Sequence, residues 1–253
     1  QNKTKDRTKM VQGVDIVNGI IQNVDPSTGK LIADPPIKVT TPSELADVIA
    51  KANAAQASWA DLALAERIEY LRKGITACEP VADELAQSIT REMGKVPAEA
   101  KEEVGDALGL KGEWLDMVAE ANADVKLGDG GEAGESVIVR DPLGVVAVIS
   151  PWNYPVGEIP LLALPALAAG NAVILKPSEV TPVTGAMYCD ALSSALPEGV
   201  LQVVQGDGGV GSLLVESPDV HMVAMTGSTA TGKRIMEKCA ANLKRLVLEL
   251  GGK

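Results

Sequence analysis

Apolar residues recur at helical spacing through the first half of the chain. Between Pro42 and Ala60 they are three and four residues apart, and Thr41 can cap the start of this helix. The same spacing continues in three further ranges: Leu62–Cys78, Pro80–Met93 and Pro97–Glu120. We therefore expect an amino-terminal region that is mainly helical.

Segments rich in glycine and polar residues on either side of this region predict β-hairpins. One lies near the start, at Asn23–Gly29. The other, LGDGGEAGES at 127–136, can join strands at Asp124–Lys126 and Val137–Arg140. Glycine and aspartate suit such turns because they tolerate backbone conformations that other residues avoid.

The pattern changes after Asp141, where short β-branched runs alternate with apolar, helix-like segments. The candidate strands are Val145–Ser150, Ala172–Lys176, Leu201–Gln205, Met222–Thr226 and Arg245–Leu250. Strands separated by helices build parallel sheets that are covered on both faces. The sequence therefore predicts the α/β class, with a doubly wound, Rossmann-like parallel sheet that binds ligands at the carboxyl ends of its strands.

The composition is that of a globular protein with a buried core. Of the 253 residues, 46% are hydrophobic and 23% are charged, which excludes a disordered chain. The net charge of −11 repels polyanions, so we expect neither nucleic acid nor an anionic membrane as a partner. The chain contains no Phe, so its core must consist mainly of aliphatic side chains.

Further expectations concern cellular location and metals. No segment has the length and apolar character of a membrane span or a secretory signal. Cys78, Cys189 and Cys239 lie scattered in predicted helices, and His221 lacks the spacing of a metal ligand. We expect no metal site and a reducing compartment, either the cytoplasm or an organelle lumen. Because the chain starts with Gln1 and not with Met, we also expect it to be part of a longer protein.

The first candidate strand ends in an unusual segment, SPWNYP at 150–155. Two prolines restrict the backbone around Asn153, whose amide can donate hydrogen bonds to a developing oxyanion. The indole N–H of Trp152 is available to a phosphate oxygen. The structural alternative is a proline-rich turn that is capped by asparagine.

The second candidate strand ends in Lys176, followed by Ser178 and Glu179. Lys176 and Glu179 can bind the hydroxyl groups of a ribose, with Glu179 as the acidic residue of a dinucleotide fold. The alternative is an ordinary strand exit, in which Ser178 and Glu179 belong to the first turn of a helix.

The fourth candidate strand runs into TGSTATGK at 226–233. A glycine turn from strand to helix presents backbone N–H groups to a phosphate. The spacing is that of the dinucleotide fingerprint with Thr229 in place of its middle glycine. The segment is not a P-loop, because Arg234 replaces the Ser or Thr that would bind magnesium, and this disfavours phosphoryl transfer.

The fifth candidate strand ends in Leu248-Glu249-Leu250. A carboxylate between leucines is costly to bury in its ionised form, which suits a general base. The alternative is an acidic residue that simply reaches water at the end of its strand.

The motifs occur together and in order: ISPWNYP, PALAAGNAVILKPSE, VVQGDG, VAMTGSTATGKRI and LVLELGGK. This series resembles the NAD(P)-dependent aldehyde dehydrogenase superfamily from about Asn23 to Lys253, nearly the whole chain but only the amino-terminal half of a family member. The resemblance implies a small-molecule aldehyde as substrate and NAD as cofactor, with NADP as an alternative. It also implies a homo-oligomer, either a dimer or a tetramer.

The resemblance assigns a role to each matching residue. Asn153 would be the side-chain donor of the oxyanion hole, and Glu249 would be the base that activates water. The residues implied to contact the cofactor are Ser150, Trp152, Lys176, Ser178, Glu179, Gly206, Gly211, Gly227 and Ser228. Because a carboxylate repels a 2′-phosphate, Glu179 implies a preference for NAD.

The resemblance also implies a division into domains. The expected parts are an amino-terminal extension (1–22), a helical part of the cofactor-binding domain (23–123), an oligomerisation hairpin (124–141) and a Rossmann-like part (142–253). The catalytic domain, with the cysteine that attacks the aldehyde and forms a thioester, would lie beyond this chain. We therefore expect this chain alone to be inactive.

Three other functions compete with this one. The chain could be a catalytically inactive dinucleotide-binding or structural module. It could belong to a reductive relative that acts on an acyl phosphate, or to an acylating relative that uses coenzyme A. Glu249 argues against the last two, because neither reaction needs a hydrolytic water.

Overall fold

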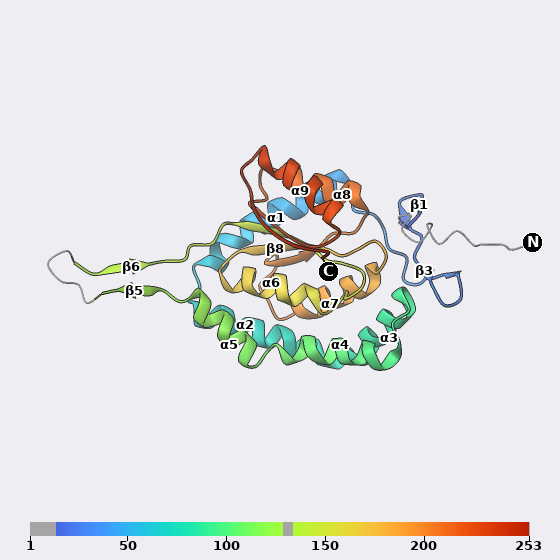
Figure 1. Cartoon of the computed structure of the whole chain (residues 1–253), viewed down its shortest axis with the longest axis horizontal. Coiled ribbons are helices and arrows are strands. Elements are labelled where there is room, and N and C mark those ends of the chain that lie inside the picture. Colours follow the sequence, from blue (N-terminus) through green and yellow to red (C-terminus); the bar gives the residue numbers. More distant parts are fainter. Residues whose placement is uncertain (1–13, 129–133, 253) are drawn as a thin grey trace, which may run out of the picture.

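Five parallel strands form the central sheet of the computed structural model, which describes residues 14–128 and 134–252 (Figure 1). The strands are β7 (Val145–Ile149), β8 (Ala172–Lys176), β9 (Leu201–Val203), β10 (Met222–Gly227) and β11 (Arg245–Leu250). Their order across the sheet is β11-β10-β7-β8-β9, with all neighbours parallel. The predicted α/β class and Rossmann-like sheet are confirmed.

Helices cover both faces of the sheet because alternate side chains of each strand point to opposite faces. Val145 and Ala147 pack with α1 (Pro42–Ala60), α8 (Gly208–Glu216) and α9 (Thr229–Ala240). On the other face, Val146 and Val148 pack with two helices: α6 (Glu158–Ala168) and α7 (Pro182–Ser193). The sheet is therefore doubly wound, as the alternating pattern predicts.

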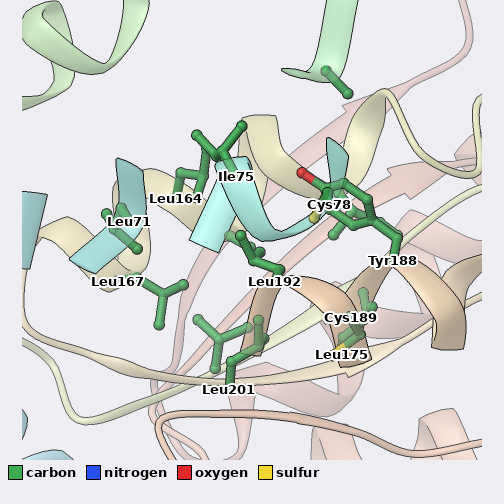
Figure 2. Packing of buried hydrophobic residues seen from close by; sticks show 14 of the residues in the cluster. Leu71, Ile75, Cys78, Leu164, Leu167, Leu175, Tyr188, Cys189, Leu192 and Leu201 are labelled. Atoms are coloured by element: carbon green, nitrogen blue, oxygen red, sulfur yellow. The ribbon is translucent and has the colours of Figure 1, made fainter. Parts of the chain in front are cut away.

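A further helical layer lies outside α6 and α7 (Figure 1). It consists of α2 (Leu64–Ala77), α3 (Ala82–Met93), α4 (Pro97–Gly109) and α5 (Glu113–Asn122), with a short 3₁₀ turn at Glu79–Val81. Figure 2 shows how the layers meet: Leu71 and Ile75 of α2 lie close to Leu164 of α6 and Leu192 of α7. Within the predicted helical region, α2 to α5 therefore pack on one face of the Rossmann-like part, whereas α1 packs on the other.

Several predicted boundaries need correction. The expected helix Pro97–Glu120 is two helices, because the backbone leaves the helical region at Gly112 (φ −86°, ψ −131°). Glycine gains more conformational freedom outside a helix than other residues, so a break at this position costs little. The helix expected from Pro80 begins at Ala82, after the 3₁₀ turn, and the one expected over Leu62–Cys78 covers Leu64–Ala77.

Both predicted hairpins are present. The first pairs β3 (Val24–Asp25) with β4 (Lys30–Leu31), and the second pairs β5 (Val125–Leu127) with β6 (Ser136–Ile138). The second extends away from the sheet as an arm (Figure 1). Its turn residues 129–133, and residues 1–13 of the expected amino-terminal extension, lie outside the described residues.

A third hairpin was not predicted. It pairs β1 (Ile16–Val17) with β2 (Ile20–Ile21) inside the expected extension 1–22. Its strands are too short for an alternating pattern to be recognised in the sequence.

Within residues 14–128 and 134–252, no helix combines the length and apolar character that crossing a membrane requires.

Candidate functional site

The strand order places the topological switch point of the sheet, where α/β folds bind ligands in a crevice, at the carboxyl ends of β7 and β10. These two strands are neighbours in the sheet, and the chain leaves them toward opposite faces, which is where α/β sheets bind ligands. Ile149 pairs with Met225, so Ser150 and the Gly227–Ser228 turn follow directly at the same edge. The structure thus brings three of the predicted cofactor residues together.

Ser228 begins α9 as its N-cap. Its backbone is extended (φ −73°, ψ 145°), and its hydroxyl accepts a hydrogen bond from the backbone N–H of Thr231 at 3.2 Å. The first N–H groups of a helix have no partner within the helix and attract anions. Ser228 therefore positions a helix start at the switch point, and its phosphate-binding role stays a prediction.

Lys176 lies buried at the end of β8, with 3% of its surface exposed. Its ammonium donates to the carbonyl oxygens of Pro177 at 2.9 Å and Gly206 at 2.6 Å, and it lies 3.7 Å from a carboxylate oxygen of Glu179. Burial lowers the pKa of Lys176, while the nearby charges of Glu179 and Asp207 raise it. The structure confirms that Lys176 and Glu179 lie together, but it gives the ammonium two backbone partners that sequence reasoning missed.

The loop after β9 closes around this lysine. Gly206 has φ +152°, and a Cβ there would lie 2.3 Å from Cγ2 of Val210. A Cβ at Gly211 would lie 3.4 Å from Cε of Lys176. Gly206 is therefore required by a close approach of the backbone, whereas a side chain at 211 would make only an ordinary van der Waals contact with Lys176. Ser178 has a local role, since its hydroxyl accepts from the N–H of Val180 at 3.3 Å.

Trp152, Asn153 and Tyr154 lie exposed on the turn between β7 and α6. The turn is held from outside the sheet, because Nζ of Lys95 donates to the backbone oxygen of Asn153 at 2.9 Å. Sequence reasoning missed Lys95, and no local signal marks it. Only Val96 separates it from α4, and in the sequence it looks like an ordinary surface lysine.

Glu249 is exposed, so of its two interpretations the structure fits the acidic residue that reaches water and not the carboxylate buried between leucines. Its strand, β11, lies at the edge of the sheet and pairs only with β10 among the described residues. Glu249 is nevertheless level with the crevice, because it pairs with Thr226. The hydroxyl of Thr226 donates to a carboxylate oxygen of Glu158 at 3.1 Å. Glu158 is therefore a second acidic residue at this edge, and the sequence did not reveal it.

The cysteines and the histidine have structural surroundings. Cys78, Cys189 and Cys239 are buried, and burial raises the pKa of the Cys78 thiol to about 12. Cys78 was predicted to lie within a helix, but it lies just after the end of α2. His221 accepts a hydrogen bond from the N–H of Val145 at Nδ1, 3.0 Å away. No group of three or more potential metal ligands occurs among the residues described.

The strand order and the glycine turn at the switch point define a Rossmann-like α/β domain. A sequence model described as the Aldehyde dehydrogenase family matches residues 15–253, and the chain belongs to this family. The resemblance found in the motifs is thereby confirmed.

Two curated relatives illustrate the match. The chain is 36% identical to a probable succinate-semialdehyde dehydrogenase (NADP(+)) of Sinorhizobium fredii, over 90% of this chain and 46% of that protein. It is 34% identical to a D-glyceraldehyde dehydrogenase (NADP(+)) of Picrophilus torridus, over 92% of this chain and 47% of that protein. The chain thus spans about half the length of the curated relatives it matches.

Solved structures of similar proteins also match this chain over about half of their own length. An aldehyde dehydrogenase from Brucella melitensis biovar abortus is 30% identical, with a TM-score of 0.85 over 100% of this chain and 54% of that one. PnpE in complex with nicotinamide adenine dinucleotide is 36% identical, with a TM-score of 0.85 over 96% of this chain and 50% of that one. Both share the fold described above.

Proposed function

We propose that this chain is the cofactor-binding half of an aldehyde dehydrogenase that oxidises an aldehyde to a carboxylic acid with NAD(P). The observation that carries the proposal is the meeting of three features at one edge of the sheet. These are the helix start at Ser228, the Lys176–Glu179 pair and the turn that bears Asn153. The family resemblance implies a cofactor-binding role for the first two features and an oxyanion-binding role for the third.

The residues at the crevice fit a polar ligand. Oγ of Ser150 is buried and has no hydrogen-bond partner among the described residues. Buried hydroxyl groups in proteins nearly always have a partner, and a polar ligand at this edge would supply one for Ser150. NAD(P), when bound, supplies the acceptor for a hydride.

Each proposed role follows from the chemistry of the side chain. Ser228 and the first N–H groups of α9 would hold the pyrophosphate, and Lys176 with Glu179 would hold the adenosine ribose. The amide of Asn153 would donate to the oxyanion that forms when a cysteine thiolate attacks the aldehyde. Glu249 would take a proton from the water that cleaves the thioester.

Glu179 bears on the choice of cofactor. A carboxylate at the ribose accepts hydrogen bonds from the hydroxyl groups of NAD and repels the 2′-phosphate of NADP. The two relatives cited above carry NADP in their names, and one structural neighbour is a complex with NAD. We propose a preference for NAD, with NADP as the alternative.

The decisive test uses the full-length protein that contains this chain. Reduction of NAD(P)⁺ is followed by absorbance with a panel of aldehydes, in the wild type and in Asn153→Ala. Loss of an oxyanion donor should lower kcat by about 10²–10³-fold, with little change in the Kd for the dinucleotide. Dinucleotide binding without aldehyde oxidation would instead favour the inactive-module alternative, and reduction of an acyl phosphate would favour the reductive one.

A further inference from the structure

Lys95 lies in the short connection between α3 and α4 and extends its side chain under the turn that carries Asn153. Only 8% of this side chain is exposed. Its ammonium lies 2.9 Å from the backbone oxygen of Asn153 and 3.8 Å from the centre of the Tyr154 ring. It also donates to a carboxylate oxygen of Glu103 at 2.5 Å. One buried cation therefore contacts two consecutive residues of the turn.

Glu103, on α4, holds the other end of the same turn. Its side chain is 1% exposed, and its second carboxylate oxygen accepts hydrogen bonds from the N–H groups of Val156 and Gly157, each at 2.9 Å. The pair thus fixes the backbone on both sides of Pro155. The hydrogen bonds from the pair to the turn all join residues more than 50 positions apart, so they form only when the outer helical layer packs onto the sheet.

A buried ion pair is weak evidence for stability. Removing two charges from water costs several kcal/mol, and the attraction between them often does no more than offset that cost. Here every hydrogen bond of the pair beyond the ion pair itself goes to the backbone of residues 153–157. The arrangement therefore specifies the geometry of one turn.

We propose that Lys95 and Glu103 are positioning residues, which act on catalysis by holding the turn so that the amide of Asn153 points at the reacting oxygen. This inference rests on the proposed function, in which Asn153 is the oxyanion donor. A displacement of about 1 Å at such a donor can lower the rate by about 10²-fold. Of the residues proposed to contact the dinucleotide, Lys176, Glu179 and Ser228 lie outside this turn, and Ser150 and Trp152 precede the backbone that the pair holds, residues 153–157.

The test is a double-mutant cycle on kcat in the full-length protein. Lys95→Met and Glu103→Gln are made in the wild type and in Asn153→Ala. If the pair acts through Asn153, each substitution lowers kcat by about 10²-fold in the wild type and has almost no further effect in Asn153→Ala. The KM for the dinucleotide stays close to the wild-type value in all of them, which a general loss of structure would not allow.

Two matched controls separate position from charge. Glu102→Gln removes a neighbouring, exposed carboxylate of α4, and Lys73→Met removes an exposed lysine that also pairs with a glutamate and lies over a tyrosine ring. Both should leave kcat unchanged. If Lys95→Met does not fold, Lys95→Arg replaces it in the cycle, because it keeps the buried charge but moves the donor away from the oxygen of Asn153.

The outcomes are distinct. A wild type that reduces no NAD(P)⁺ with any aldehyde overturns the proposed function and, with it, the positioning role. An active wild type in which Lys95→Met costs the same factor with and without Asn153, or no more than Lys73→Met, overturns the positioning role alone.

Discussion

Glu92 is a buried carboxylate that connects three parts of the chain. From α3 it accepts hydrogen bonds from the N–H groups of Val183 at 3.0 Å and Thr184 at 2.8 Å, at the start of α7, and from the amide of Asn23. Burial raises its pKa, and these hydrogen bonds lower it. A side chain of one helix thus caps another, and in doing so it fixes the amino-terminal segment.

We predict that Glu92→Ala destabilises the chain by about 2–4 kcal/mol, because it leaves buried N–H groups of α7 without a partner. Urea unfolding followed by circular dichroism measures this change. Glu84→Ala, on the exposed face of the same helix, is the control and should change the free energy of unfolding by less than about 0.5 kcal/mol. Equal effects of the two substitutions would contradict the capping role.

The buried thiols predict how stability depends on pH. Burial raises the pKa of Cys78 from 9.0 to about 12 and also raises that of Cys189. A group whose pKa is raised by folding stabilises the folded state fully below its unfolded pKa and loses that contribution as pH rises toward the folded value. We therefore expect the free energy of unfolding of this chain to fall between about pH 9 and pH 12, measured by urea titration at each pH.

The same surroundings predict low thiol reactivity, since the thiolate is the nucleophile. In the folded chain at pH 8, a disulfide reagent should modify none of the cysteines quickly, and all three after denaturation. Cys78→Ser and Cys189→Ser identify which thiol reacts if one does. A fast-reacting thiol in the folded chain would contradict the structural role given to these residues.

At the scale of elements, the arm formed by β5 and β6 has an unusual surface. Its apolar side chains are exposed, with Leu127 at 51% and Ile138 at 45%. A hairpin of two strands is marginally stable by itself in water, so these side chains are expected to pack against something larger. The arm was predicted as an oligomerisation element, and its exposed surface supports that proposal.

We predict that Leu127→Glu in the full-length protein produces a smaller assembly, measured by size-exclusion chromatography with light scattering. A charge buried in an interface without a partner is unfavourable. Leu31→Glu, at an equally exposed position of β4, is the matched control and should leave the assembly unchanged. An unchanged mass for Leu127→Glu would exclude the arm as the oligomerisation element.

At the scale of the whole molecule, the described residues include candidates for binding the dinucleotide but lack an accessible thiol that could attack the aldehyde. The residues for the dinucleotide lie at one edge of the sheet, but the candidate base Glu249 is exposed on the edge strand and no described cysteine is accessible. We therefore predict that the 253-residue chain alone binds NAD⁺ weakly and oxidises no aldehyde.

Calorimetric titration with NAD⁺ and an absorbance assay with aldehydes test this on the isolated chain. Lys176→Met should abolish the remaining binding, while Lys233→Met, on the exposed surface of α9, should not. Measurable aldehyde oxidation by the isolated chain would contradict the requirement for a cysteine outside it.

The sequence by itself determined the α/β class, the five strands, the helical region and two hairpins, because helical and strand periodicities depend only on nearby residues. The motifs at the strand ends also identified the family. The sequence did not predict the break at Gly112, since a glycine inside an apolar pattern is compatible with a continuous helix.

Only the tertiary structure decided which distant residues meet. Lys95 and Asn153 are 58 positions apart, and Glu92 and Thr184 are 92 apart, so no local pattern connects them. The pairing of Glu249 with Thr226 is decided in the same way, because it depends on which strands are neighbours in the sheet. Side chains that act through long-range contacts are chosen by packing, and packing exists only in the folded chain.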